Sequence, residues 1–442
     1  MKWLAAIFAV FICAAAYAET VEISDRESLA IAQILLGGGD VESAEKIYAA
    51  SLRSPDPEVV VESAFQIGNI AMARGDFESA IKYYYAIIKN NPAVARVRLE
   101  LARAYFMNGD YQEAEFHFQF ILAAPDLPPE VAEKIGAFLA LIRQRKNWTL
   151  DFSFGIVPDS NLNVASGRVE ECVDTIFGPF CRNLEEKKSG VGLRLNTEGN
   201  YYTRFSKRFG LRTTLGLSWL DFPAGRFDEQ SLNIASGPRY AFDRGEVSMQ
   251  PTASLRWYGG RFYNSGYGLR MDTNWQLADR LFAGAGASIR RNIYDGYAEN
   301  VLGGYDAAVY LRPRYYLDDK SFLIGGIGFD QTSAKAEVYG YGGPTYSLGY
   351  FGEFRAGFSI FAQVGLTDAA YMAPDWFLMD GEFRQQTRRD LTWQLYGRVY
   401  NAKLEWHNLV PAISYAYILR DSNAPNYDFE KHRIELEIVR RF

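Results

Sequence analysis

From Trp148 to the end of the chain, apolar and polar side chains alternate with a period of two. The first such stretch places apolar residues at Trp148, Leu150, Phe152, Phe154 and Ile156. Successive side chains of a β-strand point to opposite faces, so this alternation predicts strands with one apolar and one polar face. We expect fourteen strands, near residues 148–156, 191–195, 211–219, 232–234, 247–257, 269–277, 281–289, 305–317, 321–331, 346–356, 358–370, 389–400, 406–419 and 432–442.

The connections between these strands are of two kinds. Tight polar turns are expected at Lys207-Arg208, Asp243-Arg244-Gly245, Asp279-Arg280 and Asp318-Asp319-Lys320. Longer segments are expected at 158–188, 258–266, 331–345 and 371–388. Short turns at one end and long loops at the other are typical of a membrane β-barrel whose long loops lie outside the cell.

The last stretch, 432–442, alternates in the same way and ends on an aromatic residue, Phe442. This pattern is typical of the sorting strand of a bacterial outer-membrane protein. Because lipid offers no hydrogen bonds to a strand's backbone, this strand must pair, and we expect it to pair with 148–156. Residues 147–442 would then form a closed, fourteen-stranded antiparallel transmembrane β-barrel. A soluble β-sandwich is the alternative, but it would need fewer aromatic residues and no sorting strand.

Composition agrees with a barrel and excludes other classes. Aromatic residues make up 15% of the chain, and membrane barrels use such residues as girdles at the lipid interface. No later segment has the eighteen apolar residues that a membrane-spanning helix needs. A net charge of −6 gives no reason to expect a nucleic-acid partner. Residues 1–18 read as a signal peptide, with Lys2, an apolar core and a small-residue cleavage site ending at Ala18.

Between the signal peptide and the barrel, three units repeat at steps of 36 and 34 residues. Each has a glycine, an alanine five residues later and an aromatic residue nine residues later: Gly39, Ala44 and Tyr48; Gly75, Ala80 and Tyr84; Gly109, Ala114 and Phe118. This spacing predicts tetratricopeptide (TPR) repeats, in which a tight turn joins two helices and the alanine lets them approach. The aromatic residue usual near the start of each unit is replaced by Ala64 and Arg98.

A further helix is expected at about 130–145, capping the repeats, so that residues 19–146 form an α-solenoid in the periplasm. Its end carries Arg143, Arg145 and Lys146. These cations either favour the helix C-terminus or contact lipid headgroups at the barrel rim. The chain is thus predicted to be an α+β protein with two domains, the solenoid and the barrel.

Few residues suggest chemistry. Cys172 and Cys181 lie close together in a loop of an exported chain, so a disulfide is expected; a metal pair is the minor alternative. His117 is expected to be a packing residue, and His407 and His432 lie in separate strands. We therefore expect no catalytic, cofactor-binding or metal site, and no enzyme.

The stretch after the first strand contains Asp159, Ser160, Asn161 and Asn163, and the same triplet returns at Asp421-Ser422-Asn423. If the barrel closes, both triplets lie at its outer end near the closing seam. They either shape a seam or loop gate there, or are two independent turns in which Asp, Ser and Asn bond their own backbone.

Together these features resemble the surface lipoprotein assembly modulators, or Slam proteins, of the type XI secretion system. The resemblance rests on the repeats, the first strand with Asp159-Ser160-Asn161 and Asn163, and the later segments 354–357, 361–366 and 388–390. It implies an outer-membrane translocon that exports surface lipoproteins or related soluble proteins. The implied partners are that cargo, outer-membrane lipids, the barrel-assembly machinery and periplasmic chaperones.

A polysaccharide-export channel or a passive porin is the alternative function. A polysaccharide conduit would favour many more repeats and a lumen of one charge sign. The expected inward positions instead mix both signs, at Arg194, Glu198, Arg212, Asp272 and Arg355. A porin would leave the repeats unexplained.

Overall fold

The computed structural model of the chain describes residues 23–124, 127–223, 225–379, 381–406 and 409–440. The predicted signal peptide, His407 and Phe442 lie outside the described residues. The contacts divide the chain into two compact units, one up to Tyr83 and one from Tyr84 to Phe442. The predicted domain boundaries at 19, 146 and 147 stay predictions.

The first unit consists of helices. They are α2 (Asp25–Gly37), α3 (Val41–Ser51), α4 (Pro57–Arg74) and the first part of α5 (Phe77–Ile88). Gly39 and Gly75 have φ values of 88° and 78°, which a glycine adopts without the steric cost of a Cβ. Ala44 and Tyr48 are fully buried and form a core with Ala32 and Ile67. The repeat prediction is confirmed in this unit.

The second unit begins with three more complete helices, α6 (Ala95–Asn108), α7 (Tyr111–Ile121) and α8 (Pro129–Arg145). Gly109 ends α6 with a φ of 91° and lets the chain turn into α7. Ala114 and Phe118 of α7 are fully buried. The third repeat and the capping helix were therefore both predicted correctly.

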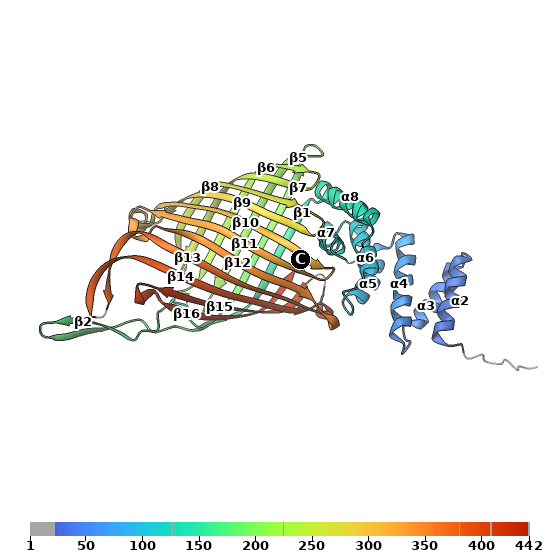
Figure 1. Ribbon diagram of the computed structural model, residues 1–442, viewed down its shortest axis with the longest axis horizontal. Coiled ribbons are helices and arrows are strands. Elements are labelled where there is room, and N and C mark those ends of the chain that lie inside the picture. The colour runs from blue at the N-terminus through green and yellow to red at the C-terminus, as the bar shows by residue number, and fades with distance from the viewer. Residues whose placement is uncertain (1–22, 125–126, 224, 380, 407–408, 441–442) are drawn as a thin grey trace, which may run out of the picture. The chain divides into compact units, whose positions relative to one another are not determined.

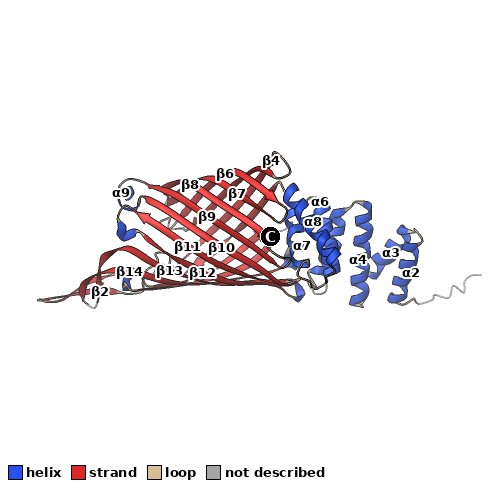
Figure 2. Cartoon of the chain, turned by 45° about the horizontal axis from the view of Figure 1, so that its top comes forward, coloured by secondary structure: helices blue, strands red, loops and turns tan. Residues whose placement is uncertain are grey.

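The rest of the second unit is the barrel, and Figures 1 and 2 show its tilted strands. Fourteen antiparallel strands close in the order β1-β16-β15-β14-β13-β12-β11-β10-β9-β8-β7-β6-β5-β4, while β2 and β3 form a separate hairpin. Their bounds are β1 Trp148–Asp159, β2 Glu170–Thr175, β3 Gly178–Asn183, β4 Gly190–Arg204, β5 Phe209–Asp221, β6 Glu229–Phe242, β7 Gly245–Tyr258, β8 Arg261–Gln276, β9 Leu281–Tyr294, β10 Gly304–Asp318, β11 Ser321–Ala334, β12 Tyr341–Glu353, β13 Phe358–Met379, β14 Glu382–Asn401, β15 Leu409–Ser422 and β16 Phe429–Arg440. The predicted fold class is confirmed.

The two faces of the wall differ as the alternation predicted. Outward positions such as Ile327 and Leu348 leave large apolar side chains exposed, as lipid contact requires. Inward positions such as Arg212 and Asp272 are polar and buried. None of the described helices combines the length and hydropathy that crossing a membrane requires.

Two expectations about the connections and one about the lumen were wrong. The segment 258–266 is no long loop, because β7 and β8 meet at Gly259-Gly260, both with positive φ. The segment 371–388 belongs mostly to β13 and β14, which extend beyond the neighbouring strands. Arg355 lies exposed in a short turn, η2 (Arg355–Gly357), and does not face the lumen.

The barrel has two distinct ends. We call the end where β1 begins and α8 finishes the helical end, and the opposite end the loop end. The turns 205–208, 243–244, 277–280 and 319–320 lie at the helical end, and the segment 160–189 with the β2–β3 hairpin lies at the loop end.

Candidate functional site

Helix α7 inserts its aromatic side chains into the helical end of the barrel. Phe120 is fully buried, and its ring centroid lies 5.0 Å from that of Tyr316, 5.9 Å from Phe322 and 6.1 Å from Phe351. These three rings belong to β10, β11 and β12. Successive side chains of a strand point to opposite faces, and these three buried rings lie on the inward face. We call these four rings the aromatic plug. Gln119 adds a polar contact, since Tyr316 Oη donates to its Oε1 at 2.7 Å.

A buried arginine connects the last repeat to the barrel. Arg98 of α6 is fully buried, and its Nη2 lies 2.6 Å from Glu353 Oε2 at the end of β12. The same nitrogen donates to the Pro92 carbonyl at 2.8 Å, and the guanidinium lies 5.1 Å from the centre of the Phe120 ring. A buried cation is tolerated only when it is paired and hydrogen-bonded, so Arg98 and Glu353 depend on each other.

His117 completes this cluster from α7. It is buried, its Nδ1 lies 3.3 Å from Arg98 Nη1, and its ring stacks on Tyr105. The prediction that it is a packing residue is confirmed. Arg98 occupies a position where the repeat usually carries an aromatic residue, but the sequence did not indicate its contact with Glu353.

Helix α7 also contacts the strand that closes the barrel. Glu113 Oε1 accepts a hydrogen bond from Arg440 Nη2 of β16 at 3.1 Å. The Arg440 guanidinium lies 5.0 Å from the centre of the Trp148 ring, at the start of β1. Burial raises the pKa of the Glu113 carboxyl, although Arg440 opposes this shift. One arginine therefore connects α7 with both strands of the seam.

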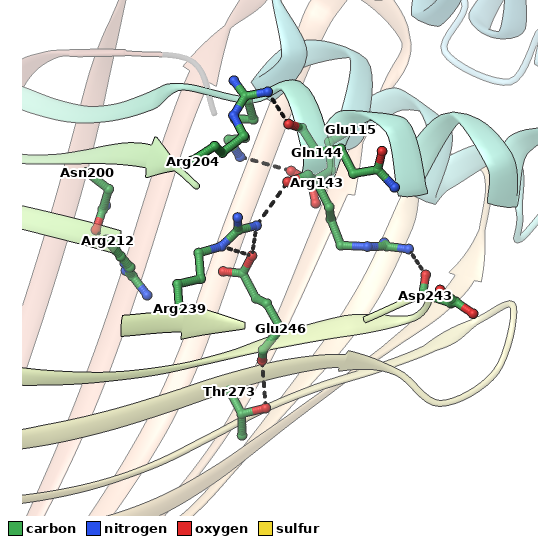
Figure 3. A network of polar contacts seen from close by, with 11 residues as sticks. Glu115, Arg143, Gln144, Asn200, Arg204, Arg212, Arg239, Asp243, Glu246 and Thr273 are labelled. Carbon is green, nitrogen blue, oxygen red and sulfur yellow. Dashed lines mark hydrogen bonds and ion pairs between the residues drawn. The ribbon is translucent and has the colours of Figure 1, made fainter. Parts of the chain in front are cut away.

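The end of α8 is held by cations from the barrel wall (Figure 3). Arg239 of β6 donates to the Arg143 carbonyl at 3.0 Å and pairs with Glu246, while Arg204 of β4 donates to the Arg145 carbonyl at 2.8 Å. The last carbonyls of a helix have no partner within it and carry partial negative charge, so guanidinium groups stabilise them.

The basic cluster at the end of α8 contacts the chain itself. Arg143 donates to the Asp243 carbonyl in the turn between β6 and β7, and the Arg145 guanidinium lies over the Phe106 ring. Lys146 Nζ lies 2.9 Å from Glu115 Oε2. These contacts all lie within the protein, and the interpretation that the cluster binds lipid headgroups stays a prediction.

The Glu115 carboxyl on α7 stays ionised more readily than usual. Burial opposes its ionisation, but the positive charges of Lys146, Arg143 and Arg314 outweigh that effect and hold the pKa of Glu115 below its ordinary value of 4.5. Protonation of this carboxyl would remove a contact between α7 and the end of α8.

The lumen wall is polar, and several of its charges are paired. Arg270 lies 2.6 Å from Asp272, and Arg398 lies 2.9 Å from Glu437. Asn200 accepts hydrogen bonds at 2.9 Å from Arg212 Nε and at 2.8 Å from Thr214 Oγ1. Such a wall offers hydrogen bonds of both kinds without a strong field of one sign.

The seam between β1 and β16 is paired unevenly. Its register runs from Ser153↔Val439 to Ile156↔Leu436 and resumes only at Asp159↔Arg433. Beyond it, the Ser160 amide donates to the His432 carbonyl at 3.0 Å, and the His432 amide donates to Ser160 Oγ at 2.8 Å. Asp159 pairs with Lys431 at 2.8 Å.

The two asparagines of the first motif join loop segments. Asn161 is fully buried; its Nδ2 donates to the Ala165 carbonyl at 2.9 Å and the Glu430 carbonyl of β16 at 3.2 Å. Asn163 bonds the return segment, accepting from the Lys188 amide at 2.9 Å and donating to the Glu186 carbonyl at 2.9 Å. The motif thus fastens the first loop to the closing strand.

The second triplet lies at the same end of the barrel but contacts a different strand. Asn423 Oδ1 accepts from the Arg389 amide at 2.8 Å, and its Nδ2 donates to the Thr387 carbonyl at 2.9 Å, both on β14. The structure brings both triplets to the loop end, and each joins its own pair of strands.

The expected disulfide is present. Cys172 and Cys181 are joined across the β2–β3 hairpin, with a Cα–Cα distance of 4.0 Å. Glu170 lies close to both sulfur atoms, but bonded sulfurs supply no thiolate to a metal, so these residues do not fit a metal site.

Comparison with known proteins agrees with this architecture. The family model described as surface lipoprotein assembly modifier matches residues 148–442, and the model of that family's N-terminal TPR repeats matches residues 32–118. Surface lipoprotein assembly modifier 1 of Haemophilus influenzae is 24% identical over 372 residues, covering 78% of this chain and 70% of the relative. The hemophilin secretion modulator of Acinetobacter baumannii is 22% identical over 382 residues, covering 80% and 74%.

Among solved structures, the CymD monoaromatic hydrocarbon channel aligns with 72% of this chain and 94% of its own, at 12% identity and a TM-score of 0.36. The family match covers the whole barrel and most of the repeats. This chain is therefore an outer-membrane barrel protein, and it belongs to the surface lipoprotein assembly modifier family.

Proposed function

We propose that this protein is a translocon that moves exported polypeptides from the periplasm through its barrel to the cell surface. The helical repeats, in the periplasm, receive the cargo, and no catalytic step is involved. The names of the relatives support this direction, since they refer to surface lipoprotein assembly and hemophilin secretion. The cargo is accordingly a surface lipoprotein or a related soluble protein.

The observation that carries the proposal is the aromatic plug. Phe120 reaches the lumen from a repeat helix and is fully buried among rings of the barrel wall. A passive pore gains nothing from a helix of a cargo-receiving domain placed in its mouth. A translocon needs such a closure, because its passage must stay shut until cargo arrives.

The contacts around the plug are suited to reversible opening. Arg98–Glu353 and Glu113–Arg440 are ion pairs between helix and barrel, and water solvates both charges of a pair once they separate. Cargo that binds the repeats better when α7 has moved would shift this equilibrium toward the open state.

A cross-link across the plug tests the proposal. Gln119→Cys with Tyr316→Cys, in a Cys172→Ser/Cys181→Ser background, provides one thiol on α7 and one on β10 for a bifunctional thiol reagent with a reducible spacer, which is needed because cysteine is shorter than the two side chains that now form the hydrogen bond. We expect the cross-linked protein to remain inserted but to lose display of an epitope-tagged surface lipoprotein, and reductant to restore it. Each single cysteine is the control. Undiminished display by the fully cross-linked protein would show that α7 need not move and would contradict the proposal.

Reconstitution separates this function from a channel. Liposomes containing the purified protein should show little steady conductance and should transfer cargo in a cargo-dependent way. A steady conductance with no cargo transfer would favour the porin or polysaccharide-channel alternative.

A further inference from the structure

A cavity lies at the loop end of the barrel, between two hairpins that are far apart in sequence. One is the disulfide-bonded β2–β3 hairpin, and the other is the part of β13 and β14 that extends beyond their neighbours (Figure 1). We call this space the outer cavity. Its volume is about 650 Å³, within the range of ligand-binding sites. Among its lining residues are Phe180, Trp376, Phe377, Phe383 and Tyr427.

Specific contacts hold the two hairpins together. The Asp174 amide of β2 donates to the Gly381 carbonyl at the tip of the β13–β14 hairpin, at 3.0 Å. Gly381 has a φ of 82°, which glycine adopts without the steric cost of a Cβ, and the Asp174 carboxylate lies against it. Asn426 donates to Glu171 at 2.5 Å, which fastens β2 to the segment before β16. The cavity is thus a built feature of this end.

Large aromatic side chains of the cavity remain exposed. Trp376 is 61% exposed, Phe383 59% and Phe180 71%. Trp376 and Phe383 lie past Tyr371, where β12 stops pairing with β13, and Phe180 lies on the separate β2–β3 hairpin, so all three are beyond the continuous wall of the barrel. Exposed apolar patches on a protein mark interaction surfaces, and here the aromatic residues line a cavity beyond the wall of the barrel.

The strand beside the cavity also offers backbone groups. Past Tyr371, no described strand pairs with β13 on the β12 side, although the Met372 amide donates to the Gly340 carbonyl at 2.9 Å. The cavity borders the four consecutive residues Asp375 to Leu378, whose side chains alternate between the two faces of the strand. An extended polypeptide satisfies both features, because it can pair with a strand edge while its side chains enter the cavity.

Charge refines the choice of ligand. The lining contains the carboxylates of Glu171, Glu185 and Asp375 but only one cation, Arg182, which pairs with Glu171 at 2.6 Å. Glu185 is exposed, and its hydrogen bond with Asn163 and its ion pairs with Lys188 at 3.6 Å and Arg226 at 3.5 Å lower its pKa and balance its charge. Asp375 is therefore the lining carboxylate that forms no ion pair with a described residue, and a basic side chain of the ligand can pair with it. A segment with apolar side chains and a basic residue fits this lining better than an acidic one.

We propose that the outer cavity is a receiving site that binds an extended, apolar and basic segment of the exported polypeptide as it leaves the lumen. This inference rests on the proposed translocon function and adds a surface-side partner site to it. Binding at the exit would hold the emerging chain and oppose its return while the rest follows.

Photocross-linking during export tests both ideas separately. A photoreactive residue replaces Trp376 or Phe383 in the outer cavity, or Gln363 in the lumen wall. Gln363 lies on the same face of β13 as Phe361, two residues earlier, and Phe361 packs against the aromatic plug. Trp393, exposed on the outside of β14, is the matched control. We expect cross-links to tagged cargo at 363, 376 and 383 and none at 393.

Each other outcome is decisive. Cross-links at 363 without any at 376 and 383 would overturn the receiving site while the translocon stands. No cargo cross-link at 363 would overturn the translocon and the receiving site together. Adducts at 376 and 383 with lipopolysaccharide instead of protein would overturn the inference, because the aromatic residues would then be a lipid contact.

A functional variant gives a second readout. Trp376→Ser with Phe383→Ser should lower cargo display by about tenfold, because aromatic anchors dominate such interfaces. Cross-links at 363 should increase as cargo is delayed in the lumen. Phe177→Ser is the control: Phe177 lies in the turn of the β2–β3 hairpin, is 94% exposed and does not line the cavity. Equal display by both variants would contradict the proposal.

Discussion

At the scale of single residues, the informative ones are polar side chains buried where helix meets barrel. Arg98 and Glu353 are both buried, and the energetic cost of dehydrating them is offset by their contact with each other and by the contacts of Arg98 with the Pro92 carbonyl, His117 and the Phe120 ring. Such a pair contributes little stability overall but makes the docking of α6 and α7 specific.

Removing one member of this pair should loosen the plug. Glu353→Ala leaves a buried, unpaired guanidinium, a change that typically costs ~3–5 kcal/mol. We expect the variant barrel to fold but to show a higher steady conductance in planar bilayers. The double variant Arg98→Met/Glu353→Met should return the conductance toward the original level. A single variant as tight as the original protein would show that this pair does not hold the plug.

The Glu115 carboxyl predicts how the contact between α7 and α8 depends on pH. Because the pKa of Glu115 is lowered in the folded protein, its contribution to stability is complete above the ordinary pKa of 4.5 and is lost as the pH falls through the lowered value. Proteolysis of the helices in detergent should therefore accelerate as the pH falls below 4.5. Glu115→Gln should show this faster cleavage already at neutral pH; an unchanged pH profile would contradict the assignment.

At the scale of elements, the loops at the far end of the barrel are fastened to strands by side chains. Asn161 fastens the first loop to β16, and Asn423 fastens the segment after β15 to β14. The hypothesis of a single gate built from both triplets is not needed to explain their contacts. A role of Asp159, Ser160, Asn161 and Asn163 in opening the seam remains a proposal.

Loss of the Asn161 side chain should weaken the seam. Asn161→Ala removes three hydrogen bonds from a buried site and leaves carbonyl groups unsatisfied, a change worth ~1–3 kcal/mol. The folded barrel should then convert to its slower-migrating unfolded form at a lower temperature on semi-native gels. Asn423→Ala, which acts on β14, is the comparison. If the two variants melted alike, Asn161 would have no special role at the seam.

At the scale of the whole molecule, the helices from α6 onward share a compact unit with the barrel. Aromatic residues of α7 complete the packing of Tyr316, Phe322 and Phe351. Two separate family models match the repeats and the barrel, so the sequence comparison treats them as two segments. In the structure, α7 packs against the barrel and joins the two segments.

Deleting residues 19–146 tests this connection. The barrel should still insert, because its fourteen strands close on themselves. Cargo display should fall, and steady conductance should rise, since the deletion removes Phe120 from the lumen. Heat-modifiability on gels checks insertion. Normal cargo display by this variant would remove the repeats from the mechanism.

The sequence by itself determined the barrel, the three repeats and the disulfide. Each of these depends on local pattern: period-two alternation from Trp148 onward, Gly, Ala and aromatic residues at fixed spacing, and two nearby cysteines. Strand ends were harder to predict from sequence. Beyond the membrane neither face of β13 or β14 needs to be apolar, so the alternation fades where both strands continue.

Only the tertiary structure decided how distant segments meet. Arg98 and Glu353 lie 255 positions apart, and nothing in the neighbourhood of either residue indicates the other. The outer cavity likewise depends on two hairpins joined at Asp174 and Gly381. Such contacts follow from the closure of the barrel and the docking of α7, and pairing over these separations leaves no periodic trace in the sequence.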